Sequence, residues 1–254
     1  MVCFTIALRS KESTNHWEQV MEDFNNTLAS IFNQTNPDFQ VFVGCNEIPI
    51  LRREYDDRLH FITTDLPVPR TWEEKCRDRS WKLCLCAKEI RIRMSELQVC
   101  GGTFVFPVDD YVSNRIAEWA AKHPGANGFK SKNGYKWRKG SSMLEITPYY
   151  GGTMNIMKMY EDDLPLEMPD QALCFDKETA MRLTKRYSIR WYDIEVERKF
   201  AELGKPLERL PFRSTIYVVG TGYNISNEDP HWNKKQDDRF HPVAFFEKHQ
   251  SSHV

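Results

Sequence analysis

The sequence predicts a single α/β domain, residues 1–254, built on a mostly parallel sheet with helices on both faces and a smaller antiparallel insert. β-prone runs alternate with amphipathic helical patterns through the first half, which is typical of a parallel sheet wound with helices. From residue 126 to 160 the pattern changes to short alternating segments rich in Gly, Tyr and Lys. A chain of 254 residues with 41% hydrophobic and 28% charged residues is long enough for one large globular domain.

The first half is predicted to run strand, helix, strand, strand, helix, strand. The β-prone run 2–8 is followed by a helix that we expect to begin after Asn15, with Glu18 completing a capping box. Apolar residues then recur at helical spacing as far as Ile31. The remaining elements are strands over 39–44, 59–63 and 103–107, with a long helix through 80–94.

In the second half, the region 126–160 predicts short antiparallel strands. Helices are expected over 177–186 and 193–203, the second closed by Gly204, and a late strand over 214–220. The polar residues after 226 predict a C-terminal tail without a core of its own.

Charge and hydropathy exclude several classes of function. The net charge of -1 and the pI near 6.7 provide no basic surface for nucleic acid, so no nucleic-acid partner is expected. No apolar run approaches the length of a transmembrane helix, and the first residues are typical of a strand rather than a signal peptide. We therefore expect a cytoplasmic protein.

Two adjacent carboxylates, Asp109 and Asp110, follow the strand "TFVFP". Ligands of open parallel sheets bind at the carboxyl ends of the strands, and hard oxygen ligands there suit Mg²⁺ or Mn²⁺. The alternative is a solvated turn whose charge favours the N-terminus of a following helix, with Ser113 as its cap. The local pattern alone leaves both interpretations open.

A second acidic motif is "WYDIEVERKFAELGKPLERLP", over 191–211. Asp193 lies at the expected start of a helix whose inward positions are apolar, and Gly204 ends it. Taken by itself, this motif is also explained by an N-terminal acidic residue and a solvated charged face.

Taken in order, three phrases resemble nucleotide-sugar-dependent glycosyltransferases of the GT-A (Rossmann-like) fold, most of all the inverting type of family 2. "FTIALRS" with the following helix resembles the opening of that family, including its "tL.SIl.Q" phrase, here "TLASIFNQ". "TFVFPVDDY" resembles the strand that carries the Asp-x-Asp motif, and the motif at 191–211 resembles the "ED…R…G" helix. Two positions depart from the family pattern: Pro107 replaces an aspartate, and Tyr192 replaces the glutamate before the catalytic aspartate.

The resemblance implies roles for particular residues. Asp109 and Asp110 would hold Mn²⁺ or Mg²⁺ against the diphosphate of the donor, with His231 as a further metal ligand. Asp193, with Glu195 as the reserve candidate, would be the general base that activates an acceptor hydroxyl for inverting attack. The positions expected to bind the donor are Arg9, Ser10, Glu47, Asp78, Lys82 and Asp109. Ordinary loop or helix charges are the alternative for Arg9, Glu47, Asp78 and Lys82.

The resemblance also divides the chain by role: 1–112 for the nucleotide-sugar, 113–226 for the acceptor and catalysis, and 227–254 as the polar tail. It implies a hexosyl- or deoxyhexosyltransferase of polysaccharide biosynthesis, acting on a carbohydrate or lipid-linked glycan acceptor, and it leaves peripheral membrane association open. Two rivals remain. A nucleotidyltransferase on a related sheet would need a glycine-rich phosphate loop, and "LRSKEST" has no glycine. A non-catalytic binding or scaffold protein would keep the fold with a degenerate site.

Overall fold

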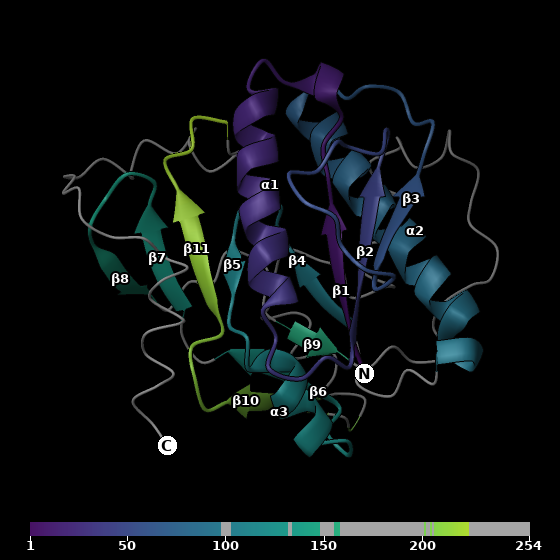
Figure 1. The fold of residues 1–254 in the computed structure, drawn as a ribbon, viewed down its shortest axis with the longest axis vertical. Coiled ribbons are helices and arrows are strands. Elements are labelled where there is room, and N and C mark those ends of the chain that lie inside the picture. The colour runs from purple at the N-terminus through teal and green to yellow at the C-terminus, as the bar shows by residue number, and fades with distance from the viewer. Residues whose placement is uncertain are drawn as a thin grey trace.

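A computed structural model describes residues 1–97, 103–131, 134–147, 155–157, 201, 204 and 206–223. In these residues the chain forms a mixed α/β structure with two sheets (Figure 1). The helix expected over 177–186, most of the one expected over 193–203 and the tail 227–254 lie outside the described residues.

The main sheet confirms the expected parallel arrangement. Its seven strands lie in the order β10-β6-β9-β4-β1-β2-β3. Strands β3, β2, β1 and β4 are mutually parallel, and β9 is antiparallel to both of its neighbours. The strands are β1 (Val2–Ala7), β2 (Phe39–Cys45), β3 (Leu59–Thr63), β4 (Thr103–Phe106), β6 (Gly128–Ser131), β9 (Asn155–Met157) and β10 (Glu208–Leu210).

Helices cover both faces of this sheet, as predicted. Helix α1 (Trp17–Phe32) connects β1 to β2, and α2 (Trp72–Leu97) connects β3 to β4. The first connection moves across the sheet toward β3, and the second moves back across it past β2 and β1. Because both crossovers are right-handed, the two helices lie on opposite faces of the sheet. Alternate residues of β1 follow this division: Phe4 belongs to the cluster that includes the apolar side of α1, and Cys3 packs with Cys86 and Ile90 of α2.

Helix α1 begins one residue later than the capping-box pattern predicts. Its N-cap is His16, which makes no side-chain capping bond, and the carbonyl of His16 accepts the first helical hydrogen bond, from Val20 N at 3.0 Å. The backbone N–H of His16 instead donates to the hydroxyl of Thr14 at 3.1 Å. This local turn sets the direction in which the chain enters α1. A short 3₁₀ helix, η1 (Lys11–Ser13), precedes this turn.

The second sheet has four strands in the order β5-β11-β7-β8. They are β5 (Tyr111–Val112), β7 (Gly134–Arg138), β8 (Leu144–Thr147) and β11 (Thr215–Val219). The insert predicted over 126–160 is therefore divided between two sheets: β6 and β9 join the main sheet, while β7 and β8 join the second one. The pairing in the second sheet is antiparallel except between β7 and β11, which are parallel.

The helix expected directly after the Asp pair is displaced. Tyr111 and Val112 are buried and pair with β11 as strand β5, and helix α3 (Ile116–Lys122) begins only afterwards with Arg115 at its N-cap. Pairing with a strand over 100 residues later in the chain thus overrides the local helix signal. Ser113 still stabilises the turn that leads into α3, because its hydroxyl accepts the N–H of Arg115 at 3.3 Å.

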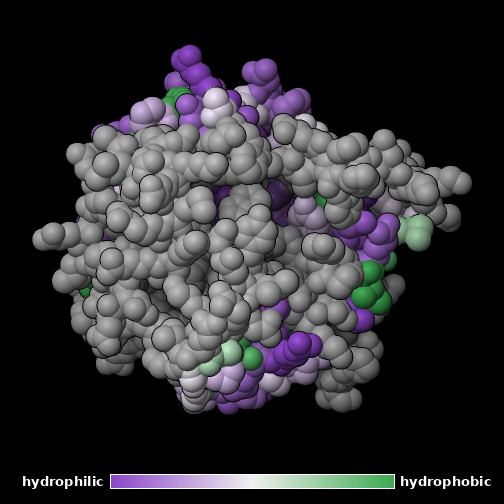
Figure 2. All heavy atoms as spheres, turned by 180° about the vertical axis from the view of Figure 1, so that it is seen from behind, coloured by the Kyte–Doolittle hydropathy of each residue, from purple (hydrophilic) through white to green (hydrophobic). Residues whose placement is uncertain are grey.

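Within the described part of the chain, no helix combines the length and apolarity needed to cross a membrane. The large apolar side chains that are exposed there are Ile48, Ile50, Ile92, Met143 and Ile146. On the face opposite to that of Figure 1, the coloured surface is mostly hydrophilic with small separate apolar spots (Figure 2). This scattering is ordinary for a globular surface.

Candidate functional site

The order β3-β2-β1-β4 places a topological switch point between β1 and β4. The chain leaves β1 toward β2 on one side, and β4 is added on the other side. The loops that follow the two strands therefore separate, and ligands of open α/β sheets bind in the crevice that results. Arg9 and Ser10 follow β1, and Asp109 follows β4, so these predicted residues lie at the same edge of the sheet.

Arg9 and Asp109 are close enough for their charges to interact. Partial burial lowers the pKa of Arg9 below its ordinary value, and the charges of Asp109, Tyr223 and Asp78 act against that shift. Asp109 is itself buried. The structure therefore brings together three of the residues predicted to bind the donor, from the ends of β1 and β4 and from the first half of α2.

The two aspartates have different neighbours. The Oδ1 atom of Asp110 accepts a hydrogen bond from the backbone N–H of Val218 in β11 at 2.9 Å, and Asp110 is fully buried. Strand β5 pairs with β11 only at Thr215 and Ile216, so the carboxylate of Asp110 continues the contact beyond the end of that short strand. Asp109, by contrast, interacts with the charges of Arg9 and Tyr223. Asp110 therefore connects the segment after β4 to β11, whereas Asp109 lies at the switch point.

A buried polar stripe on α1 holds the segment that carries the Asp pair. The hydroxyl of Thr27 is shared between the carbonyls of Val108 at 3.0 Å and Asp110 at 2.7 Å, which flank Asp109. One turn further on, the hydroxyl of Ser30 accepts the N–H of Val112 at 3.2 Å. These contacts fix the backbone on both sides of Asp109.

Gln34, just beyond the end of α1, extends this stripe. Its amide group donates to the carbonyl of Ser113 at 2.8 Å and accepts the N–H of Ala117 at 2.9 Å. Thr27, Ser30 and Gln34 are the polar members of the phrase "TLASIFNQ" that make these contacts. In this chain the phrase therefore connects directly to "VDDY", the other end of the predicted site.

Asp78 and Lys82 form a buried ion pair beneath the edge of the sheet. Lys82 Nζ lies 2.8 Å from Asp78 Oδ2, and the exposed fractions of the Lys82 and Asp78 side chains are 0% and 5%. Burial raises the pKa of Asp78 above its ordinary value, while the charges of Lys82 and Arg9 oppose the shift. Lys82 is thus a partner of Asp78 under the surface rather than a solvent-facing cation. Oδ1 of Asp78 has no hydrogen-bond partner within the part of the chain that the structure describes.

Glu47 and Ser10 shape the loops at this edge. Glu47 is exposed, and its Oε1 accepts the backbone N–H of Lys11 at 2.8 Å, which ties the end of β2 to η1. Ser10 is buried, and its carbonyl accepts the hydroxyl of Ser13 at 2.7 Å. Both therefore lie at the predicted edge, where their observed contacts stabilise the loop after β1.

A pocket of about 800 Å³ opens beside this loop. It lies between η1, the loop after β3 and the first turn of α2, and it is lined by Glu12, Ser13, Pro67, Val68, Pro69, Arg70 and Glu74. Oε2 of Glu74 accepts the N–H groups of Arg70 at 2.7 Å and Thr71 at 3.0 Å, so a side chain of this chain already occupies the N-terminus of α2. The pocket offers an apolar wall and a few polar groups rather than a helix-terminal anion site.

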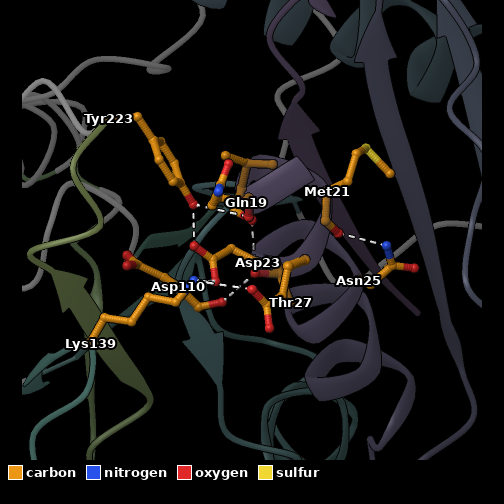
Figure 3. Close-up of polar contacts among 10 residues, drawn as sticks. Gln19, Met21, Asp23, Asn25, Thr27, Asp110, Lys139 and Tyr223 are labelled. Atoms are coloured by element: carbon orange, nitrogen blue, oxygen red, sulfur yellow. Dashed lines mark hydrogen bonds and ion pairs between the residues drawn. The ribbon is translucent and has the colours of Figure 1, made fainter. Parts of the chain in front are cut away.

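Tyr223 is a member of the site that the sequence did not reveal. It follows β11, and its carbonyl accepts a hydrogen bond from Arg9 Nη1 at 3.4 Å. Its hydroxyl donates to Asp23 of α1, and Lys139 reaches the other oxygen of that carboxylate at 2.6 Å (Figure 3). Burial, the larger cause, and the acceptor Asp23 both raise the pKa of Tyr223. The only signal was the position of Tyr223 after "GTG", a phrase typical of a turn.

A divalent cation fits Asp109 better than Asp110. Mg²⁺ and Mn²⁺ bind oxygen ligands, and Mg²⁺ is held through one or two carboxylates together with substrate phosphates. Oδ1 of Asp110 already accepts a backbone N–H, which leaves Asp109 as the carboxylate at the switch point. Among the described residues no group of three or more His, Cys, Asp or Glu side chains could hold a metal ion. Further ligands of an ion at Asp109 would be phosphate and water oxygens or residues outside the described ranges, such as His231.

Three predicted residues, Asp193, Glu195 and His231, lie outside the described residues. Comparison of the chain with protein-family models and with curated proteins gives no match. The case for a function therefore depends on the fold and on the residues at the switch point.

Proposed function

We propose that the chain is a metal-dependent glycosyltransferase with a GT-A-like fold, which moves a sugar from a nucleotide-sugar to a hydroxyl of a carbohydrate or lipid-linked glycan. The observation that carries the proposal is the position of Arg9 and Asp109 at the ends of β1 and β4, on the two sides of the switch point, where their charges interact. A cationic and an anionic side chain at that crevice suit a diphosphate bound together with a divalent cation.

The contact between two sequence phrases supports this proposal. Thr27, from the phrase that resembles the opening helix of the family, hydrogen-bonds to both carbonyls that flank Asp109. The two phrases resemble the family independently of each other, and the contacting residues Thr27 and Val108 are 81 residues apart in the sequence. Both contribute to the same turn, the one that carries the metal-binding candidate.

The described residues would share the work of binding the donor. The guanidinium of Arg9 would lie against the diphosphate, where a planar group with several donors suits phosphate oxygens. Asp109 would hold Mg²⁺ or Mn²⁺, which when bound supplies positive charge for the leaving diphosphate. The pocket beside η1 and Arg70 is large enough for a further part of the nucleotide.

The transfer step needs a base, for which we propose Asp193, with Glu195 as the reserve candidate. Its carboxylate would take the proton of the acceptor hydroxyl while the oxygen forms a bond to the anomeric carbon. The bond from that carbon to the diphosphate breaks on the opposite side, so the configuration is inverted. A lipid-linked acceptor would bring the protein to a membrane surface as a peripheral partner.

A thermal-shift panel tests the donor site. UDP-, GDP-, dTDP- and CMP-sugars are each added with Mn²⁺, with Mg²⁺ and with a chelator. Binding to the folded state raises the Tm by mass action, so we expect a rise with one nucleotide class that requires the metal. Asp109→Asn is expected to remove the rise, and Asp57→Asn, at an exposed loop position, should keep it.

Transfer is then measured with the nucleotide that binds, as release of nucleoside diphosphate. Metal-dependent release that is lost in Asp193→Asn supports the glycosyltransferase. Binding without release under any acceptor condition would favour the scaffold alternative, and no binding at all would overturn the proposal.

A further inference from the structure

One face of α1 is connected through hydrogen bonds to the neighbourhood of both residues that define the candidate site, Arg9 and Asp109. Asp23 and Thr27 lie one helical turn apart on this face (Figure 3). Thr27 binds the backbone around Asp109 directly. Asp23 reaches Arg9 through one intermediary, Tyr223.

The ring of Tyr223 is fixed at two points. Its hydroxyl donates to Oδ2 of Asp23, a carboxylate that is only 4% exposed. Its ring stacks on His16, with the ring centroids 6.2 Å apart and the planes inclined by 29°. A buried, charged acceptor gives a phenol a stronger and more directional hydrogen bond than a neutral one would.

The chain turns at two glycines just before Tyr223. Gly220 and Gly222 have φ angles of 78° and 85°, a region that side-chain-bearing residues rarely adopt. The hydrogen bond to Asp23 and the stacking on His16 then anchor the residue that follows this turn to α1 and the loop before it.

Arg9 Nη1 donates a hydrogen bond to the carbonyl of Tyr223 at 3.4 Å. The guanidinium also interacts electrostatically with two carboxylates, Asp109 at the switch point and Asp78 on α2.

We propose that Tyr223 is a positioning residue, which through its bond to Asp23 holds Arg9 in place to receive a diphosphate. This inference rests on the proposed function, because it assigns the diphosphate to Arg9. Helix α1 then positions both charged groups of the site, Asp109 through Thr27 and Arg9 through Asp23 and Tyr223.

The test compares Tyr223→Phe with the wild-type protein. The substitution removes the hydroxyl and keeps the ring that stacks on His16. The Kd values for UDP, GDP and dTDP, each with Mg²⁺, are measured by calorimetry. We expect the bound nucleotide to lose about five- to tenfold in affinity, the loss typical of one charge-assisted hydrogen bond whose effect is passed on to a ligand-binding group.

Two controls distinguish a positioning role of Tyr223 from a general loss of fold stability. Val41→Ala removes buried methyl groups from the core at β2, away from Asp23 and Tyr223, and it is expected to lower the Tm while the Kd stays within about twofold of wild type. In an Arg9→Ala background, Tyr223→Phe should cause no further loss of affinity, because the group that it positions is gone.

The outcomes are distinct. Wild-type protein that binds none of the three nucleoside diphosphates overturns this inference, and a failure to bind any nucleotide-sugar of the panel as well overturns the proposed function. Wild-type binding with an unchanged Kd in Tyr223→Phe, or equal losses with and without Arg9, overturns the positioning role alone.

Discussion

The carboxylate of Asp110 accepts the backbone N–H of Val218 at 2.9 Å, and so joins the end of the loop after β4 to strand β11, 108 residues later. Because Thr27 binds the carbonyl of the same aspartate, Asp110 links α1, β5 and β11 at one buried point. This explains why a second carboxylate stands beside Asp109: one serves the sheet junction, and the other faces the switch point.

Replacing Asp110 should therefore destabilise the fold more than replacing Asp109. Asp110→Ala removes the buried carboxylate that accepts the N–H of Val218, and we expect a loss of about 2–3 kcal/mol in the free energy of unfolding. Asp109→Ala should cost well under half of that, since its main consequence is for ligand binding. Urea denaturation of the two variants measures the difference, and equal midpoints would contradict the division of roles.

Gly44 of β2 should not tolerate a side chain. A Cβ at this position would lie 2.8 Å from both the Cβ and the carbonyl oxygen of Lys82, and backbone of this kind cannot move aside cheaply. We expect Gly44→Ala to lower the free energy of unfolding by about 2 kcal/mol or more through overpacking between α2 and the sheet.

Gly125→Ala is the matched control for Gly44, because a Cβ there meets no atom within 4 Å. Its stability should be unchanged or slightly higher, as the unfolded chain loses conformational freedom. Urea unfolding of both variants is the measurement, and similar behaviour of the two would show that α2 does not approach β2 so closely.

The order of elements could be predicted because it depends on local patterns. The apolar runs of β1, β2 and β3 and the helical spacing of Phe24, Leu28 and Ile31 each identify an element within one stretch of chain, and the carboxyl ends of the strands then follow. Strand β5 escaped prediction because two residues carry no periodicity, and only pairing with β11 makes them a strand.

The site was predicted only in part, for a physical reason. Polar residues on a helix suggest a solvated face, yet Asp23 and Thr27 are buried with partners 200 and 83 residues away. Sequence spacing cannot distinguish these two situations. The same reason applies to Lys82, which was expected to reach a ligand, whereas the structure buries it against Asp78.

Thr27→Val should loosen the turn that carries Asp109 while preserving the shape of the side chain. Loss of the hydroxyl leaves two buried carbonyls without this donor, and we expect a cost of about 1–2 kcal/mol in the free energy of unfolding. Thr35→Val is the control, because Thr35 is exposed and solvent can replace its bonds to Asn114 and Glu118. On the proposed function, only Thr27→Val should also reduce the metal-dependent rise in Tm with nucleotide.

The buried pair of Asp78 and Lys82 predicts a pH dependence with a definite sign. The folded-state pKa of Asp78 is raised above the ordinary value of 3.8, so the folded state binds the proton more tightly than the unfolded state does. The contribution of Asp78 to the free energy of unfolding therefore falls as the pH rises from 3.8 through the folded-state pKa.

Lys82→Met should steepen that fall, because the charge that opposes the shift is removed and an uncompensated carboxylate is left buried. We expect the variant to lose about 3–5 kcal/mol near neutral pH and clearly less as the pH falls toward ~4, because proton uptake by Asp78 removes the buried charge. Denaturant unfolding of both proteins at several pH values between about 4 and 8 provides the comparison. Replacing both residues, as in Asp78→Leu with Lys82→Met, should remove this extra pH dependence, since neither charge remains. A cost that stays constant across the range would mean that Asp78 reaches solvent or another cation when Lys82 is gone.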